Sequence, residues 1–178
     1  MVAVVVFESM FGCTRAVATA VAEGMTSAGL ETVVLPVDEA LANDDLVARA
    51  RLLVVGAPTH MRGLSTARSR ALARARGADA EPGLGVHDWL DALPGLQGRA
   101  VAVFDTRSWS RFAGSAGSRI EKLLHRRGAE LVAPTQAFGV EGGDGGRATI
   151  TDAQVDLARV WGASIAAHVV GAPAGHSA

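Results

Sequence analysis

The feature that most constrains this chain is an apolar run near its N-terminus, followed by a short polar loop and an amphipathic stretch. Val2–Phe7 are apolar and rich in valine, which is typical of a strand covered on both faces in a parallel sheet. Apolar residues recur with a period of 3.6 over residues 15–27, which predicts a helix. Free backbone N–H groups and the positive end of the helix dipole converge on the loop between two such elements. This succession of strand, loop and helix therefore predicts an anion-binding site, and a phosphate is its expected ligand.

The residues of this loop indicate which class of phosphate ligand it can bind. Ser9 and Thr14 supply hydroxyl groups, and Gly12 lets the backbone approach an oxygen-rich ligand closely. The loop has no lysine and matches neither GxxxxGKS/T nor GxGxxG, which argues against a nucleoside-triphosphate loop. Two roles stay open for Ser9 and Thr14, namely phosphate binding or only capping of the helix. Cys13, the single cysteine, is either a small buried hydrophobe or a thiol activated by the helix N-terminus.

Apolar runs and helical patterns alternate along the rest of the chain. Strands are expected at Val2–Phe7, Glu31–Pro36, 52–56, 100–104 and 131–139, and helices at 15–27, 45–50, 65–76, 115–127 and 152–169. Glycines at 29 and 128 suit left-handed helix ends, while Ser115 and Thr151 suit N-caps. The alternation predicts an α/β fold, a doubly wound five-stranded parallel sheet of order 2-1-3-4-5 with helices on both faces.

The length of 178 residues fits one domain, which we place at residues 1–170, followed by a disordered tail at 171–178. Residues 81–93 predict a loop and a short extra helix, which Trp89 packs onto the body. The glycine-rich residues 141–147 predict a flexible connector.

Composition limits the partners that can be expected. Lys and Arg number 17 against 18 Asp and Glu, and the net charge of -1 gives no general argument for nucleic acid. No apolar run approaches a membrane span of about 20 residues, and no signal-peptide pattern is present, so we expect a cytoplasmic protein. No spacing of histidines, cysteines or carboxylates predicts a metal site or a catalytic triad. The oligomeric state is left open.

Two further loops should meet the first at the carboxyl ends of the strands. The loop after the third strand carries Pro58, Thr59, His60, Met61, Arg62 and Gly63. The loop after the fourth strand carries Asp105, Thr106, Arg107, Trp109 and Phe112. Flat and polarizable side chains in both loops suit contact with a planar ring, so the three loops together offer phosphate donors and two ring platforms.

This combination resembles the flavodoxin family. The resemblance rests on residues 5–15, 54–60, 104–107 and 114–116, and the order and spacing hold from residue 2 to about residue 139. It implies that the ligand is FMN, with the 5′-phosphate held by Ser9, Met10, Phe11, Gly12, Cys13 and Thr14. It also implies that residues 58–63 lie on one side of the isoalloxazine ring and residues 105–112 on the other. His60 and Met61 stand where family members usually place the first aromatic residue, and Trp109 is the candidate for the second.

Three functions remain open from the sequence. The first is an FMN-binding electron-transfer protein, with a redox partner protein. The second is an FMN-dependent reductase that takes hydride from NAD(P)H and passes it to a quinone-like acceptor. The third is a flavin-free interaction domain that retains the fold. If Arg62 and Arg107 approach a flavin, they should raise its reduction potential. The helix predicted at residues 65–76 carries four arginines, Arg68, Arg70, Arg74 and Arg76. They form either a docking surface for an acidic protein or for NADPH, or simply a solvated helix face.

Overall fold

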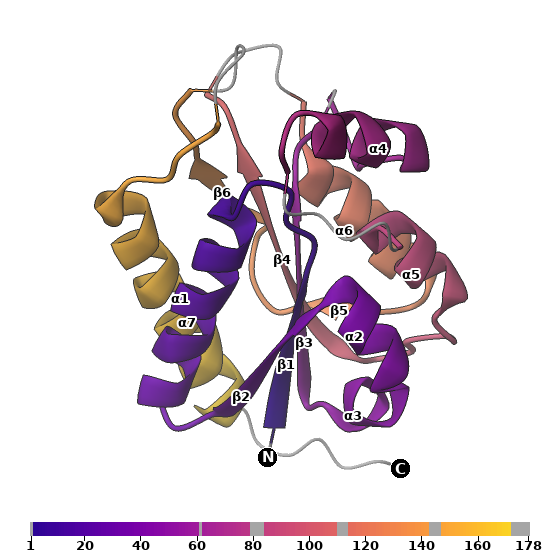
Figure 1. The fold of residues 1–178 in the computed structure, drawn as a ribbon. Helices are drawn as coiled ribbons and strands as arrows, with labels where there is room; N and C mark the ends of the chain where they lie inside the picture. The colour runs from indigo at the N-terminus through magenta and orange to yellow at the C-terminus, as the bar shows by residue number, and fades with distance from the viewer. Residues whose placement is uncertain (1, 61, 79–83, 110–113, 143–146, 172–178) are drawn as a thin grey trace.

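A computed structural model describes residues 2–60, 62–78, 84–109, 114–142 and 147–171. All strand pairs in its central sheet are parallel, in the order β2-β1-β3-β4-β5, with β6 also paired to β4 (Figure 1). The strands are β1 Val2–Phe7, β2 Glu31–Pro36, β3 Leu52–Pro58, β4 Ala100–Arg107, β5 Glu130–Leu131 and β6 Gln136–Gly139. The predicted fold class and strand order are confirmed.

Helices cover both faces of the sheet. They are α1 Cys13–Ser27, α2 Val37–Ala42, α3 Asp44–Arg49, α4 Ala67–Ala75, α5 Val86–Ala92, α6 Ala116–Arg126 and α7 Asp152–Gly171. Figure 1 shows α1 and α7 side by side on one face and α2, α3, α5 and α6 on the other. None of the helices in the described part of the chain is long and apolar enough to cross a bilayer.

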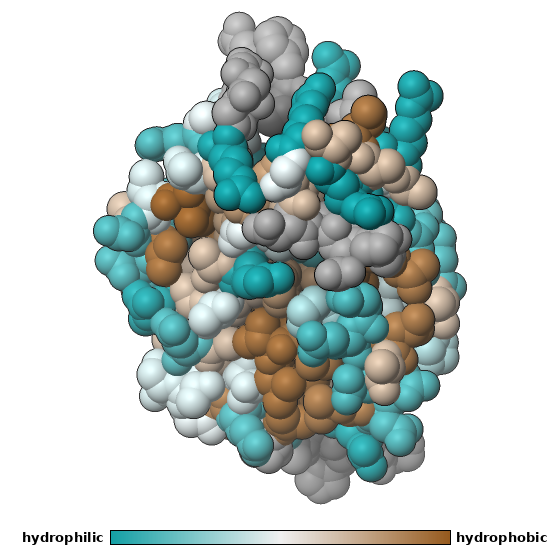
Figure 2. Space-filling model, viewed as in Figure 1, coloured by the Kyte–Doolittle hydropathy of each residue, from teal (hydrophilic) through white to brown (hydrophobic). Residues whose placement is uncertain are grey.

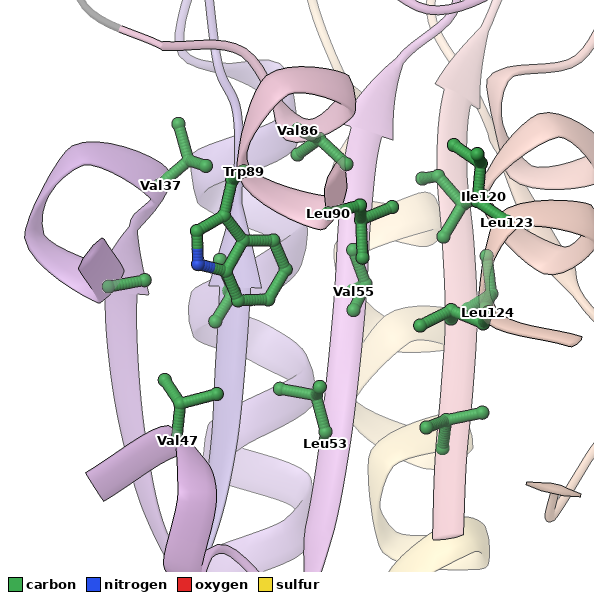
Figure 3. Close-up of a cluster of buried hydrophobic side chains, with 14 of the residues drawn as sticks. Val37, Val47, Leu53, Val55, Val86, Trp89, Leu90, Ile120, Leu123 and Leu124 are labelled. Carbon is green, nitrogen blue, oxygen red and sulfur yellow. The ribbon is translucent and has the colours of Figure 1, made fainter. Parts of the chain in front are cut away.

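The strands are buried on both faces because successive side chains point to opposite sides. In β1, Val4 and Val6 belong to the core under α5 and α6, while Val5 and Phe7 belong to the core under α1 and α7. Figure 3 shows the first of these cores, in which the Trp89 ring of α5 lies over the sheet. Trp89 is 1% exposed, so the predicted packing of this extra helix is confirmed.

Three strands differ from their predicted bounds. β3 and β4 run further, to Pro58 and Arg107, because β6 pairs with the last four residues of β4 and extends the sheet there. The expected strand at 131–139 is two strands, β5 and β6. Pro134 lies between them, and a proline has no N–H to donate to the ladder.

The helix expected at 45–50 is α3, and a second short helix, α2, precedes it where none was predicted. α2 and α3 are two short helices, each of six residues, and a helix of less than two turns is too short to show a clear 3.6-residue period. α1 begins at Cys13, two residues before the prediction. Gly29 and Gly128 have φ of 85° and 82°, and the Ser115 hydroxyl accepts a hydrogen bond from Ser118 N–H, as predicted. The expected tail at 171–178 starts with the last residue of α7, and residues 172–178 lie outside the described part of the chain.

Candidate functional site

A cavity of about 760 Å³ opens at the carboxyl ends of β1, β3, β4 and β6, at the upper end of the sheet in Figure 1. Its volume lies in the range of small-molecule and cofactor sites. β1, β3 and β4 end side by side because Phe7 pairs with Gly56, and Gly56 pairs with Phe104. The predicted site residues that line this cavity are Met10, Phe11, Cys13, Thr14, Pro58, Thr59, His60, Thr106 and Arg107.

The loop after β1 is folded around the Ser9 hydroxyl. Ser9 Oγ accepts hydrogen bonds from the N–H groups of Gly12, at 3.2 Å, and Arg15, at 3.4 Å. Gly12, at the N-cap of α1, has φ of 92°, a left-handed conformation that favours glycine. Within the described residues, the N–H groups of Met10, Phe11 and Thr14 donate to no protein acceptor. Ser9 thus caps α1, and the loop still presents free donors at the helix N-terminus.

Thr14 and Cys13 tie this loop to distant parts of the chain. The Thr14 and Thr106 hydroxyls are hydrogen bonded at 2.8 Å, which joins α1 to the end of β4. Cys13 Sγ donates to the Ala148 carbonyl at 3.2 Å. Burial raises the pKa of the Cys13 thiol, although a hydrogen bond from its own backbone N–H opposes this effect. The thiol also lines the cavity, so the structure favours the interpretation of Cys13 as a small buried side chain over that of an activated thiol.

The chain after β3 forms a closed turn at the cavity mouth. His60 and Gly63 exchange two backbone hydrogen bonds, of 2.8 and 3.0 Å. Arg62 in this turn has φ of 74°, which is uncommon for a residue with a side chain. Arg62 also pairs through its backbone with Gly114. Met61 and Phe112, two of the predicted site residues, lie outside the described part of the chain.

Asp105 has a structural place beside the cavity. Its side chain is 1% exposed, and it does not line the cavity. Its Oδ2 accepts hydrogen bonds from the Ser115 hydroxyl at 2.7 Å, from Gly117 N–H at 2.9 Å and from the Thr59 hydroxyl at 3.3 Å. The carboxylate therefore holds the start of α6 against the turn after β3. It stabilises the cavity wall without lining the cavity itself.

His60 is the titratable ring in the cavity wall. Burial lowers its pKa, the charge of Glu8 opposes this effect, and the charge of Arg76 adds to it. Glu8 is buried, its Oε2 accepts from Val86 N–H at 3.0 Å, and its Oε1 has no partner in the described part of the chain. His60 therefore presents a neutral imidazole to the cavity near neutral pH.

Part of the cavity wall comes from segments that the sequence did not predict. These residues are Leu72 and Ala73 of α4, Arg76 directly after it, and Val140, Gly142 and Ala148 beyond β6. Ser108 also lines the cavity and belongs to the loop predicted at residues 105–112. Leu72 is 48% exposed, and a leucine among the arginines of this helix is the sequence signal that could have indicated this part of the wall. The four arginines of this helix do not act alike, because Arg70 is buried and paired with Asp88 at 2.8 Å.

Six predicted site residues in the described part of the chain do not line the large cavity: Ser9, Gly12, Arg62, Gly63, Asp105 and Trp109. Arg62 and Trp109 line a neighbouring hollow of about 550 Å³, and Arg62 and Gly63 line a third one. Trp109 is 65% exposed. Figure 2 shows hydrophilic side chains projecting from this upper end of the molecule.

Comparisons with known proteins agree with this geometry. The family model for flavodoxin matches residues 5–161. A flavodoxin from the domain Archaea is 20% identical, with a TM-score of 0.69, over 96% of this chain and 99% of that chain. Flavodoxin 1 from Bacillus cereus is 21% identical, with a TM-score of 0.67, over 93% and 97%. A WrbA-like flavodoxin from Agrobacterium tumefaciens is 18% identical, with a TM-score of 0.64, over 95% and 97%.

At these identities the structural likeness shows the fold alone. No curated protein sequence is similar enough to count as a match. The family model, however, covers most of the chain and includes the loops after β1, β3 and β4. The chain belongs to the flavodoxin family.

Proposed function

We propose that the cavity of about 760 Å³ binds FMN and that the protein is an electron carrier of flavodoxin type. The family implies a flavin cofactor. The observation that carries the choice of FMN is the loop after β1, which presents the N–H groups of Met10, Phe11 and Thr14 at the start of α1. Such donors suit a phosphate dianion, and the loop lacks the lysine of a triphosphate site.

The remaining cavity residues fit the rest of the cofactor. Met10, Pro58, Leu72 and Val140 give the wall its apolar surface, which suits a planar ring. Thr14, Thr59 and Thr106 add hydroxyl groups for the polar chain of the ligand. Bound flavin would supply one-electron and two-electron redox chemistry, while this chain would orient it, exclude water from one side and set its potential through Arg76, Arg107 and a neutral His60.

The test is a titration of the flavin-free protein with FMN, followed by flavin fluorescence and absorbance. Gly12→Ala strains the phosphate loop, because φ is 92° there and a side chain rarely adopts that region. Gly29→Ala is the matched control, since Gly29 has φ of 85°, also has open space around it, and lies far from the cavity at the other end of α1.

Both variants should lose about 1 kcal/mol of stability, but only Gly12→Ala should weaken FMN binding, by about tenfold or more. Riboflavin, which lacks the phosphate, should bind the Gly12→Ala variant and the unmodified chain alike. A protein that leaves FMN fluorescence unchanged would support the flavin-free interaction domain and end the proposal.

A second candidate function is an FMN-dependent NAD(P)H reductase. The arginine-lined hollow beside the cavity favours it, because cationic side chains suit the phosphates of a nucleotide. The FMN-loaded protein would then oxidise NAD(P)H without any partner protein, whereas a pure carrier would not.

A further inference from the structure

A separate hollow of about 510 Å³ lies where α4, α5 and α6 come together on one side of the molecule (Figure 1). We call it the α6 groove, after the four residues that α6 contributes to it, Arg119, Lys122, Leu123 and Arg126. Lys122 and Arg126 line this groove and neither of the other two hollows. None of the residues of the phosphate loop after β1 lines it. The α6 groove therefore belongs to the helices that cover the sheet, and it is distinct from the cavity proposed for FMN.

The cations of the α6 groove have no acidic partners. The three that α6 contributes form no ion pair with any described residue. The acid that lines the groove within the described part of the chain is Asp88 of α5. Its Oδ2 already accepts hydrogen bonds from Nη2 of the buried Arg70, at 2.8 Å, and from Gly85 N–H, at 3.0 Å. The groove therefore carries an uncompensated positive charge.

The three cations stand in one row. Arg119, Lys122 and Arg126 follow one another at intervals of three and four residues, which places them on the same face of a helix. With a rise of about 1.5 Å per residue, the row extends over about 10 Å. Leu123 lies within this row and is 6% exposed, so the cations project from a well-packed wall. Several positive charges along a concave wall suit an elongated ligand with several negative charges in succession, better than a single small anion.

α4 contributes its N-terminus to the groove and not its arginines. None of the four arginines in the helix predicted at residues 65–76 lines the α6 groove, whereas Thr66 and Ala67 do. The N–H groups of Ala67 and Arg68 donate to no acceptor among the described residues. The positive end of a helix dipole favours negative charge, so the start of α4 adds to the positive field of α6.

We infer that the α6 groove docks an acidic segment of a partner protein, whose successive Asp or Glu side chains pair with the row of cations on α6. A concave surface admits a chain segment more readily than a flat bilayer. In addition, no large apolar side chain that is exposed among the described residues lines the groove, so it has nothing to insert into lipid. The net charge of -1 does not favour a nucleic acid. This interaction surface does not depend on bound flavin, so it goes beyond the proposed function.

The test is an NMR titration of the purified, ¹⁵N-labelled chain with a hexaglutamate peptide that is blocked at both ends. We expect one peptide per chain, with saturable changes of amide shift concentrated at the start of α4 and along residues 119–126, and an affinity that decreases with added salt. The double variant Lys122→Gln/Arg126→Gln should weaken binding by about tenfold, because each exposed pair contributes up to about 1 kcal/mol.

The matched control is the double variant Arg49→Gln/Arg74→Gln, which removes the same amount of charge. Both arginines are exposed, line none of the three hollows and form no ion pair with any described residue. Their replacement should leave the affinity for hexaglutamate nearly unchanged. Equal losses in the two double variants would mean a diffuse attraction to the net charge and would overturn the inference.

Three further results would overturn it. One is the absence of saturable hexaglutamate binding. Another is binding of a hexathymidylate strand as tightly as hexaglutamate, which would indicate a nucleic-acid surface. The third is equally tight binding of inorganic phosphate, which would indicate a site for small anions. A chain that takes up FMN in the separate titration but does not bind hexaglutamate would leave the proposed function intact and remove only this docking surface.

Discussion

Single charged residues set the electrostatics of the cavity proposed for FMN. Arg76 and Arg107 line it, whereas Arg62 lies in the neighbouring hollows. Arg107 is 3.5 Å from the buried Asp105, so part of its charge is balanced, and Arg76 has no ion pair with any described residue. The sequence expected Arg62 and Arg107 to act on a flavin, and the positions of the side chains favour Arg76 and Arg107 for that role.

A positive charge near the ring stabilises the reduced, anionic flavin and raises its potential. With FMN bound, Arg76→Gln should therefore lower the two-electron reduction potential by an amount on the order of tens of millivolts. Arg107→Gln should lower it less, and Arg62→Gln should change it least. A redox titration with a reference dye measures all three variants, and an unchanged or higher potential in Arg76→Gln would contradict the assignment.

His60 makes stability depend on pH. Burial lowers its pKa in the folded protein, Glu8 opposes this effect and Arg76 adds to it, so the unfolded chain binds the proton at a higher pH than the folded chain. The free energy of unfolding should therefore fall as pH decreases through about 6.5. His60→Gln should lack this part of the decrease in urea unfolding between pH 8 and pH 5.5. His168→Gln, at an exposed position of α7, is the control and should retain it.

At the scale of elements, the packing of α1 against α7 depends on two glycines. A Cβ atom at Gly24 would collide with the Arg159 carbonyl of α7, and one at Gly162 would collide with the Val21 carbonyl of α1. The obstacles are backbone atoms, which cannot rotate away as a side chain can. The two helices therefore approach closely, and they cover the face of the sheet that includes Phe104 and Phe138.

Gly162→Ala tests this contact. Alanine favours the helix by about 1 kcal/mol over glycine, but the collision with α1 requires the helices to separate. Since overpacking costs about 1–3 kcal/mol or more, we expect a net loss of stability of about 1 kcal/mol or more in denaturant unfolding. Gly171→Ala, at the end of the same helix with nothing within 4 Å, should be neutral or stabilising. A Gly162→Ala protein as stable as the Gly171→Ala protein would show that the helices are not in close contact.

At the scale of the whole molecule, charge is balanced in total and uneven in space. The net charge is -1, yet three arginines surround one hollow at the end of the sheet that holds the candidate sites. A global charge count therefore says little about the partners of this protein. We expect a charged ligand or partner to respond to the local field at the carboxyl ends of the strands, where a low-dielectric concavity strengthens each interaction.

Much of the architecture could be predicted because it depends on patterns within short, contiguous segments of the sequence. The valine-rich run Val2–Phe7, Gly12 after it and the helical period that follows are all local, and they were sufficient to predict a parallel strand, a loop with a left-handed glycine and a helix at the first strand. The order of the strands is the doubly wound order that suits five strands alternating with helices. These features require no knowledge of which distant side chains meet.

The tertiary structure alone decided which residues outside the three predicted loops line the cavity. Leu72, Arg76 and Val140 line the cavity because α4 and the segment beyond β6 fold over the strand ends. The hydrophobic pattern within those segments does not predict where they pack. The same is true of Asp105, which is buried behind the wall, and of Trp109, which lies against Gly139. Hydrophobic pattern and turn chemistry act over a few residues and fix the elements, whereas a ligand site is made by contacts between elements and depends on their packing.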